Sequence, residues 1–218
     1  MTTKPGQEPV KVHFRNLSTP RAAAFAGVLF ALLFGTALVL IRISLPEGAA
    51  PGSQWTANDH SIRIASMLMP FAGIAFLWFI GVVRDGFGGY EDKFFSSVFI
   101  GSGLLFLAMV FIASAVGAAL THSGGDSADF GRILLLTISK TYALRMAAVF
   151  MMSLATIWLK TGLMPRWLVI ATYVVAVVCI LATDITMWLT LTFPIWVLVV
   201  SLLLLSRAGV IDLDRDGL

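Results

Sequence analysis

Two histidines flank apolar runs of the sequence, where their imidazoles are candidates for metal chemistry. His60 precedes the apolar run 64–83, and His122 follows the run 94–120. If these runs are consecutive antiparallel helices, both imidazoles lie at the same end of a bundle, where two histidines are able to ligate a haem iron or a divalent metal. Haem ligands in helical bundles usually project from within the helices. Ordinary polar contacts of loop histidines are therefore the simpler interpretation.

A second candidate site is a charged mouth on the same side as the histidines. Its candidate ligand-binding residues are Arg42, Arg63, Lys140, Arg145 and Asp184. The other polar residues expected on this side are Arg132, His60, His122, Asp59, Asp126 and Asp129. At 1.5 Å per helical residue, Arg145 lies about 22 Å from Lys160. By the same arithmetic Asp184 lies about 27 Å from Arg166, so an ion pair between Arg145 and Asp184 is allowed. Converging cations bind small anions and anionic headgroups. The alternatives are snorkelling of long side chains to the headgroups and a structural ion pair.

Familiar catalytic motifs are missing from the sequence. It contains no glycine-rich nucleotide loop, no His-Glu-x-x-His metal motif and no Gly-x-Ser-x-Gly nucleophile elbow. We therefore assign no catalytic residues, and nothing in the sequence requires a cofactor.

The composition identifies the class of protein that must position these side chains. Of 218 residues, 58% are hydrophobic and only 12% are charged, whereas soluble domains carry about 25% charged residues. A soluble globule is excluded, and Cys179 as the only cysteine excludes a disulfide scaffold. The composition predicts an all-α, polytopic transmembrane helical bundle.

Apolar runs of about 20 residues, the length needed to cross a membrane, predict six helices between a basic tail (1–21) and a short acidic tail (207–218). The expected helices span 22–41, 64–83, 94–120, 142–159, 167–183 and 187–206. The first run exceeds the apolar core of a typical signal peptide, so we interpret it as a retained helix.

Lysine and arginine are distributed unequally between the two sides of this bundle. Ten lie on the side of both termini: Lys4, Lys11, Arg15, Arg21, Arg84, Lys93, Lys160, Arg166, Arg207 and Arg215. Five lie on the opposite side: Arg42, Arg63, Arg132, Lys140 and Arg145. The positive-inside rule then predicts that both termini are cytoplasmic. Since no basic stripe with interleaved aromatic residues occurs, nucleic acid is not an expected partner.

Local signals refine the ends and bends of the helices. Asp126 and Asp129 are candidate N-caps, and a cap there would start the fourth helix before 142, with 130–139 at or above the membrane surface. Pro70 and Pro194 lie inside the second and sixth expected helices and should bend them.

One short segment carries a family resemblance. The segment Thr161–Leu168, with Pro165-Arg166-Trp167 opening the fifth helix, resembles a loop of uncharacterised six-helix bacterial integral membrane proteins. With its flanking helices it covers about a fifth of the chain. The resemblance implies a multi-pass protein of the bacterial plasma membrane and carries over no functional residues.

Three functional hypotheses remain open. The first is a non-enzymatic accessory or interaction subunit, with membrane lipids and either a membrane protein partner or a second copy of the chain as its contacts. The second is a small transporter or a lipid- or anion-binding protein that uses the charged mouth. The third is a redox protein holding haem between His60 and His122.

Overall fold

The computed structural model is helical in every segment that it describes, which confirms the expected all-α class. The described residues are 19–44, 59–86, 93–122, 125–182 and 187–213. Within them the elements follow in the order α1 (Thr19–Ser44), α2 (Asp59–Asp85), α3 (Lys93–Leu120), α4 (Asp126–Leu136), the π-helical segment η2 (Thr137–Ala143), α5 (Leu144–Thr161), α6 (Arg166–Leu181), the 3₁₀ segment η3 (Met187–Leu191) and α7 (Thr192–Leu213).

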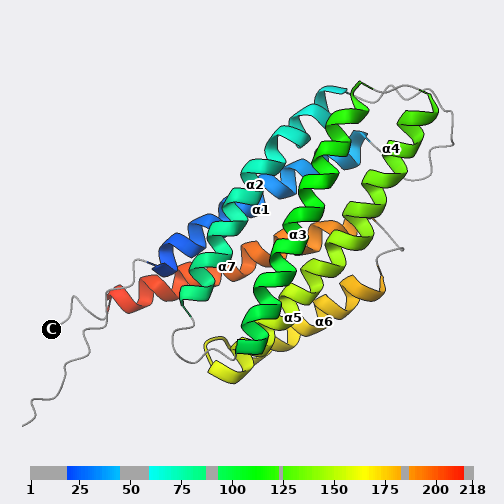
Figure 1. Ribbon diagram of the computed structural model, residues 1–218. Helices are drawn as coiled ribbons and strands as arrows, with labels where there is room; N and C mark the ends of the chain where they lie inside the picture. The colour runs from blue at the N-terminus through cyan, green and yellow to red at the C-terminus, as the bar shows by residue number, and fades with distance from the viewer. Residues whose placement is uncertain (1–18, 45–58, 87–92, 123–124, 183–186, 214–218) are drawn as a thin grey trace, which may run out of the picture.

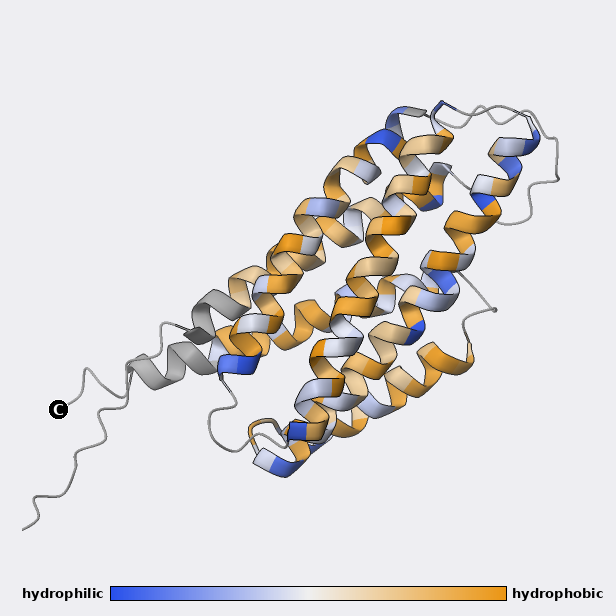
Figure 2. Ribbon diagram, viewed as in Figure 1, coloured by the Kyte–Doolittle hydropathy of each residue, from blue (hydrophilic) through white to orange (hydrophobic). Residues whose placement is uncertain are grey.

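The helices form an elongated bundle (Figure 1). α1 packs against α2 and α7, α3 packs against α2 and against α4, η2 and α5, and α6 packs against α5. α2 begins and α3 ends at one end of the bundle, called here the His122 end. α2 ends and α3 begins at the opposite end, called the Lys93 end. Hydrophobic residues extend along the helices, and hydrophilic residues gather mainly toward the helix ends (Figure 2).

The fourth expected helix is longer than the span 142–159. It begins at Asp126, passes through η2 and ends at Thr161, which makes a continuous helical rod of 36 residues. At 1.5 Å per residue the α4–α5 rod is about 54 Å long, well beyond a hydrocarbon core of about 30 Å. Asp126 and Asp129 lie in its first turn, and the N-cap is Gly125, with no side-chain hydrogen bond. The carboxylates therefore face the positive end of the helix dipole without capping it.

The turn between α5 and α6 explains the Pro-Arg-Trp segment of the sequence. Gly162 closes α5 in the left-handed conformation (φ 67°), and its N–H donates to the Trp158 carbonyl at 2.9 Å. Glycine adopts this conformation without the penalty that a Cβ brings. Pro165 is extended at the N-cap of α6 and cannot continue a helix from the preceding turn. The segment is a tight reversal at the Lys93 end.

Five described helices are long and apolar enough to cross a membrane, namely α1, α2, α3, the α4–α5 rod and α7. They fit an integral membrane protein. α6 has 16 residues and follows the expected span 167–183 as far as Leu181. Its length of about 24 Å is less than the hydrocarbon core of about 30 Å. The last helix also differs from the expected 187–206, because η3 precedes it and the α-helix runs from Thr192 to Leu213. Pro194 thus lies in the first turn of α7, where its missing N–H disrupts no helical hydrogen bond.

Aromatic side chains fill the interior of the bundle. Buried rings come from α1, α2, α3, α5 and α7: Phe30, Phe34, Phe76, Phe79, Phe99, Phe106, Phe150, Phe193 and Trp196. Their contacts include the tilted pair Phe30–Phe76 and the edge-to-face pair Phe106–Phe193, both with centroids 4.7 Å apart. Because the rings occupy the centre, the larger hollow described below lies at the surface, between α2 and α3.

Two polar contacts fasten α6 to its neighbours. Trp196 Nε1 of α7 donates to Thr172 Oγ1 at 3.0 Å, and Thr156 Oγ1 of α5 lies 2.6 Å from the Tyr173 hydroxyl. Hydrogen bonds between apolar helices satisfy groups that lipid cannot. α6 is therefore held by specific contacts although it is short.

Candidate functional site

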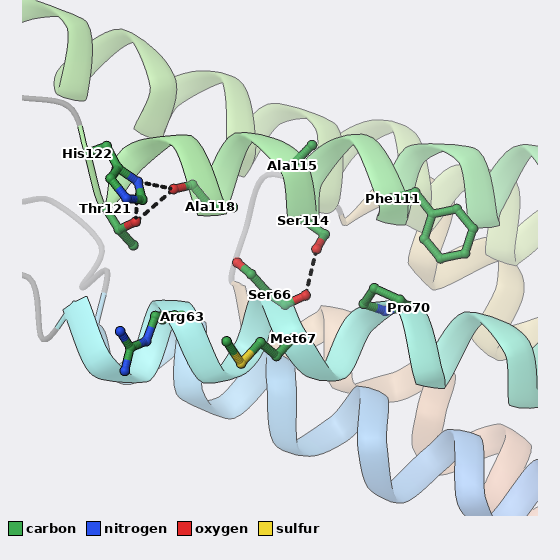
Figure 3. A pocket seen from close by; sticks show the side chains of 10 residues that line it. All are labelled: Arg63, Ser66, Met67, Pro70, Phe111, Ser114, Ala115, Ala118, Thr121 and His122. Carbon is green, nitrogen blue, oxygen red and sulfur yellow. Dashed lines mark hydrogen bonds between the residues drawn. The ribbon is translucent and has the colours of Figure 1, made fainter.

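A groove of about 470 Å³ runs between α2 and α3 at the His122 end (Figure 3). This volume lies within the range of known small-ligand pockets. α2 contributes Arg63, Ser66, Met67 and Pro70, and α3 with the turn after it contributes Phe111, Ser114, Ala115, Ala118, Thr121 and His122. The groove brings together Arg63 and His122, two residues that the sequence placed on the same side of the bundle.

Pro70 leaves one backbone carbonyl of α2, which lies at the groove, without its helical partner. A proline has no backbone N–H, so the carbonyl of Ser66, four residues earlier, lacks its usual partner in α2. The Ser114 hydroxyl of α3 donates to this carbonyl at 2.9 Å. A serine from a neighbouring helix is one of the groups that satisfy a proline-freed carbonyl inside a membrane. The bend-prone turn of α2 is thus tied to α3 at the centre of the groove (Figure 3).

Small residues set how closely α2 and α3 approach on either side of this contact. The backbone of Gly117 lies against Ser66, where an added Cβ would stand 3.0 Å from the Ser66 hydroxyl oxygen. At the opposite end of the groove the Phe111 ring occupies the space where a side chain at position 73 would project, because residue 73 is glycine. Phe111 therefore closes the groove toward the middle of the bundle, and the groove is open toward the His122 end.

The open end carries a fixed histidine. Thr121 Oγ1 donates to the Ala118 carbonyl at 2.8 Å, and His122 Nδ1 lies 2.9 Å from Thr121 Oγ1 and 3.3 Å from the same carbonyl. Whether His122 Nδ1 donates or accepts in these contacts depends on the tautomer of the imidazole. These three contacts do not involve Nε2.

Charge and polarity are separated along the groove. Arg63 is exposed at the His122 end. Toward Phe111 the lining consists of Met67, Pro70 and small side chains of α3. Among the described lining residues one is arginine, one is histidine and none is acidic. A cationic end and an apolar length match an amphipathic anion.

Arg42, Lys140 and Arg145 of the expected charged mouth are not among the residues that line the groove. The Arg42 guanidinium of α1 lies over the Trp188 ring of η3, 5.1 Å from its centroid. Lys140 is half-buried in η2. Arg145 is half-buried on α5 and shares, by helical periodicity, the face that carries Thr156, which contacts α6. Asp184 lies outside the described residues, so its pairing with Arg145 stays a prediction.

His60 is exposed in the first turn of α2 and is not among the described residues that line the groove. In the described part of the chain, no three or more His, Cys, Asp or Glu residues come together as a metal site. A haem held by His60 and His122 stays a prediction.

A smaller void of about 20 Å³ lies inside the bundle beside the π-helical turn. Its lining includes Ser139 of η2, whose hydroxyl donates to the Leu135 carbonyl at 2.7 Å, and Thr190 of η3. This is room for about one water molecule. The void is therefore a packing feature of the π-helical turn.

The sequence singled out Arg63 and His122 of the groove, but it did not assign the side chains along the length of the groove to a site. Ser66, Ser114, Met67 and Phe111 carry no motif, and each type is common in membrane helices. Pro70 offered the available signal, because a proline inside a helix frees a carbonyl four residues before it. Which helix supplies the donor depends on packing, which one sequence does not reveal.

No family model, curated protein or solved structure matches the chain. The function is therefore argued from the groove itself.

Proposed function

We propose that this integral membrane protein binds an amphipathic anion in the groove between α2 and α3. The observation that carries the proposal is the separation of polarity along one cavity, with Arg63 and His122 at its open end and an apolar lining toward Phe111. A ligand with an anionic head and an apolar tail is complementary to both parts at once.

The head of the ligand is assigned to Arg63. A guanidinium presents paired N–H donors that match phosphate and carboxylate oxygens, and the His122 imidazole on the α3 side of the groove offers a further donor when its free nitrogen carries a proton. An arginine near a membrane surface contributes about 1 kcal/mol of attraction toward an anionic headgroup. The positive charge of Arg63 thus selects an anionic head group, whereas the tail contributes hydrophobic contact with the lining of the groove.

Binding without chemistry is consistent with the sequence, which offers no catalytic motif. The role as an accessory subunit stays a separate prediction, which co-purification of the tagged protein at native expression would test. We propose that the His122 end lies on the outer side of the membrane, because the sequence predicts ten of the fifteen lysines and arginines on the other side.

The proposal is tested with a water-soluble amphiphile. In neutral maltoside micelles, calorimetric titration with n-octyl phosphate should show saturable binding, and n-octyl glucoside, which has the same tail and no charge, should not. Arg63→Gln should weaken octyl phosphate binding about fivefold, since it removes about 1 kcal/mol of attraction.

The matched control is Arg84→Gln. Arg84 is also exposed on α2 but lies at the Lys93 end. The Arg84→Gln variant should bind octyl phosphate with the same affinity as the unmodified protein. Equal affinities for the Arg63 and Arg84 variants would contradict the proposal, because the anion would then have no preference for the groove.

A further inference from the structure

The groove opens sideways toward the surface that lipid would cover. Met67 of α2 and Phe111 of α3, which line it, are 60% and 40% exposed. Phe71 and Ile112, next to them in sequence, are exposed as well. Exposed apolar side chains on both flanks indicate a surface that contacts acyl chains. A ligand dissolved in the bilayer can therefore enter the apolar part of the groove directly, without passing through water.

The level of the groove along α3 fits the boundary between hydrocarbon and headgroups. Measured from Lys93, Phe111 lies about 27 Å along the helix and Ala118 about 38 Å. If the hydrocarbon core of about 30 Å begins near Lys93, Phe111 lies within the hydrocarbon and Ala118 at headgroup level. Arg63 and His122, which share the open end with Ala118, then stand where lipid phosphates lie.

The width of the groove is set by small side chains. Ala115 and Ala118 of α3 and Met67 and Pro70 of α2 line the groove, and the Phe111 ring lies over Gly73 at its deep end. This is a channel along one helix pair, which suits a single chain lying parallel to the helices.

From these observations we infer that the occupant is an anionic phospholipid of the membrane leaflet at the His122 end. Its phosphate is held by Arg63 and His122, and one acyl chain runs past Met67 and Pro70 to Phe111. This inference rests on the proposed function and adds the source of the ligand. A water-soluble alkyl phosphate offers the same head chemistry, so the experiment separates the two sources.

The test uses the full chain in nanodiscs that contain a phosphatidylglycerol or a phosphatidylcholine with a photoreactive diazirine in one acyl chain. After illumination, cross-linked peptides are mapped by mass spectrometry. We expect cross-links to concentrate on the α2 segment 63–70 and the α3 segment 111–118, and to be about fivefold more abundant with phosphatidylglycerol.

Two pairs of variants give the controls. Arg63→Gln should lower groove cross-linking by phosphatidylglycerol about fivefold, and Arg84→Gln should leave it unchanged. Ala115→Phe, which fills the groove without altering its charge, should remove the groove cross-links. Ala119→Phe, at an exposed position of α3 that does not line the groove, should retain them.

The outcomes separate the inference that the occupant is a phospholipid from the proposed function, which is binding of an amphipathic anion. Cross-links spread evenly over the apolar helices, with octyl phosphate still bound through Arg63, would overturn the phospholipid and leave the proposed function standing. Evenly spread cross-links together with no octyl phosphate binding would overturn both. Concentration in the groove that responds to Arg63→Gln and Ala115→Phe would support both.

Discussion

At the scale of single residues, Ser114 supplies the hydrogen-bond donor that Pro70 withholds from α2. The Ser66 carbonyl has no helical partner because residue 70 has no N–H, and the Ser114 hydroxyl reaches it at 2.9 Å. A carbonyl left unpaired among apolar side chains is costly. The same three residues line the groove, so the contact that stabilises α2 also shapes the candidate site.

Replacing Ser114 with alanine should destabilise the protein by about 1 kcal/mol, because interhelical hydrogen bonds in membranes contribute roughly this much. Thermal unfolding in detergent measures the effect, expected as a decrease in Tm of about 2–4 °C for a chain of this length. Ser114→Thr keeps the hydroxyl and should restore most of the stability.

The control for this prediction is Ser97→Ala. The Ser97 hydroxyl bonds to the Lys93 carbonyl at 2.8 Å within α3 itself and is exposed, so its loss should change Tm little. Equal decreases in Tm for Ser114→Ala and Ser97→Ala would contradict the prediction, because the hydrogen bond between α2 and α3 would then stabilise the protein no more than one within α3.

At the scale of elements, the helices that line the groove and the rod beside them are longer than a hydrocarbon core requires. α3 has 28 residues and the α4–α5 rod 36, about 42 Å and 54 Å of helix. The sequence predicted the extent of α3 to within one residue, 94–120 against Lys93–Leu120. The apolar run 142–159 did not by itself set the length of the rod, although Asp126 and Asp129 indicated a start before 142. The helix continues through this more polar segment because α4 packs on α3.

Single-cysteine labelling tests the direction in which these elements cross. The native Cys179 is buried, so new thiols report their own positions. In intact cells a membrane-impermeant maleimide should label His60→Cys and Trp188→Cys, whereas Lys93→Cys should react only after lysis. The reason is the excess of lysine and arginine that the sequence predicts on the side of the Lys93 end, because the positive-inside rule would then put this end in the cytoplasm.

The reverse pattern, with Lys93→Cys labelled in intact cells, would contradict this orientation. Labelling of His60→Cys without Trp188→Cys would instead show that α6, which has 16 residues, does not complete a crossing.

At the scale of the whole molecule, composition was sufficient for the fold class and insufficient for the site. Scarcity of charge predicted an all-helical membrane bundle, and the apolar, helical structure fits it. The site needed packing information, because Arg63 and His122 lie far apart in sequence and line one groove only because α2 and α3 are antiparallel neighbours. Likewise, the buried rings come from five helices, and no sequence pattern shows that they fill one centre.

The central claim is that the groove between α2 and α3 holds the ligand, and filling the groove tests it most directly. The affinity for n-octyl phosphate is measured by titration for Ala115→Phe and Ala119→Phe, which place the same ring on α3 inside and outside the groove. We expect Ala115→Phe to abolish binding and Ala119→Phe to retain it. Undiminished binding by folded Ala115→Phe would contradict the claim, because a ligand in the groove and the new ring cannot occupy the same space.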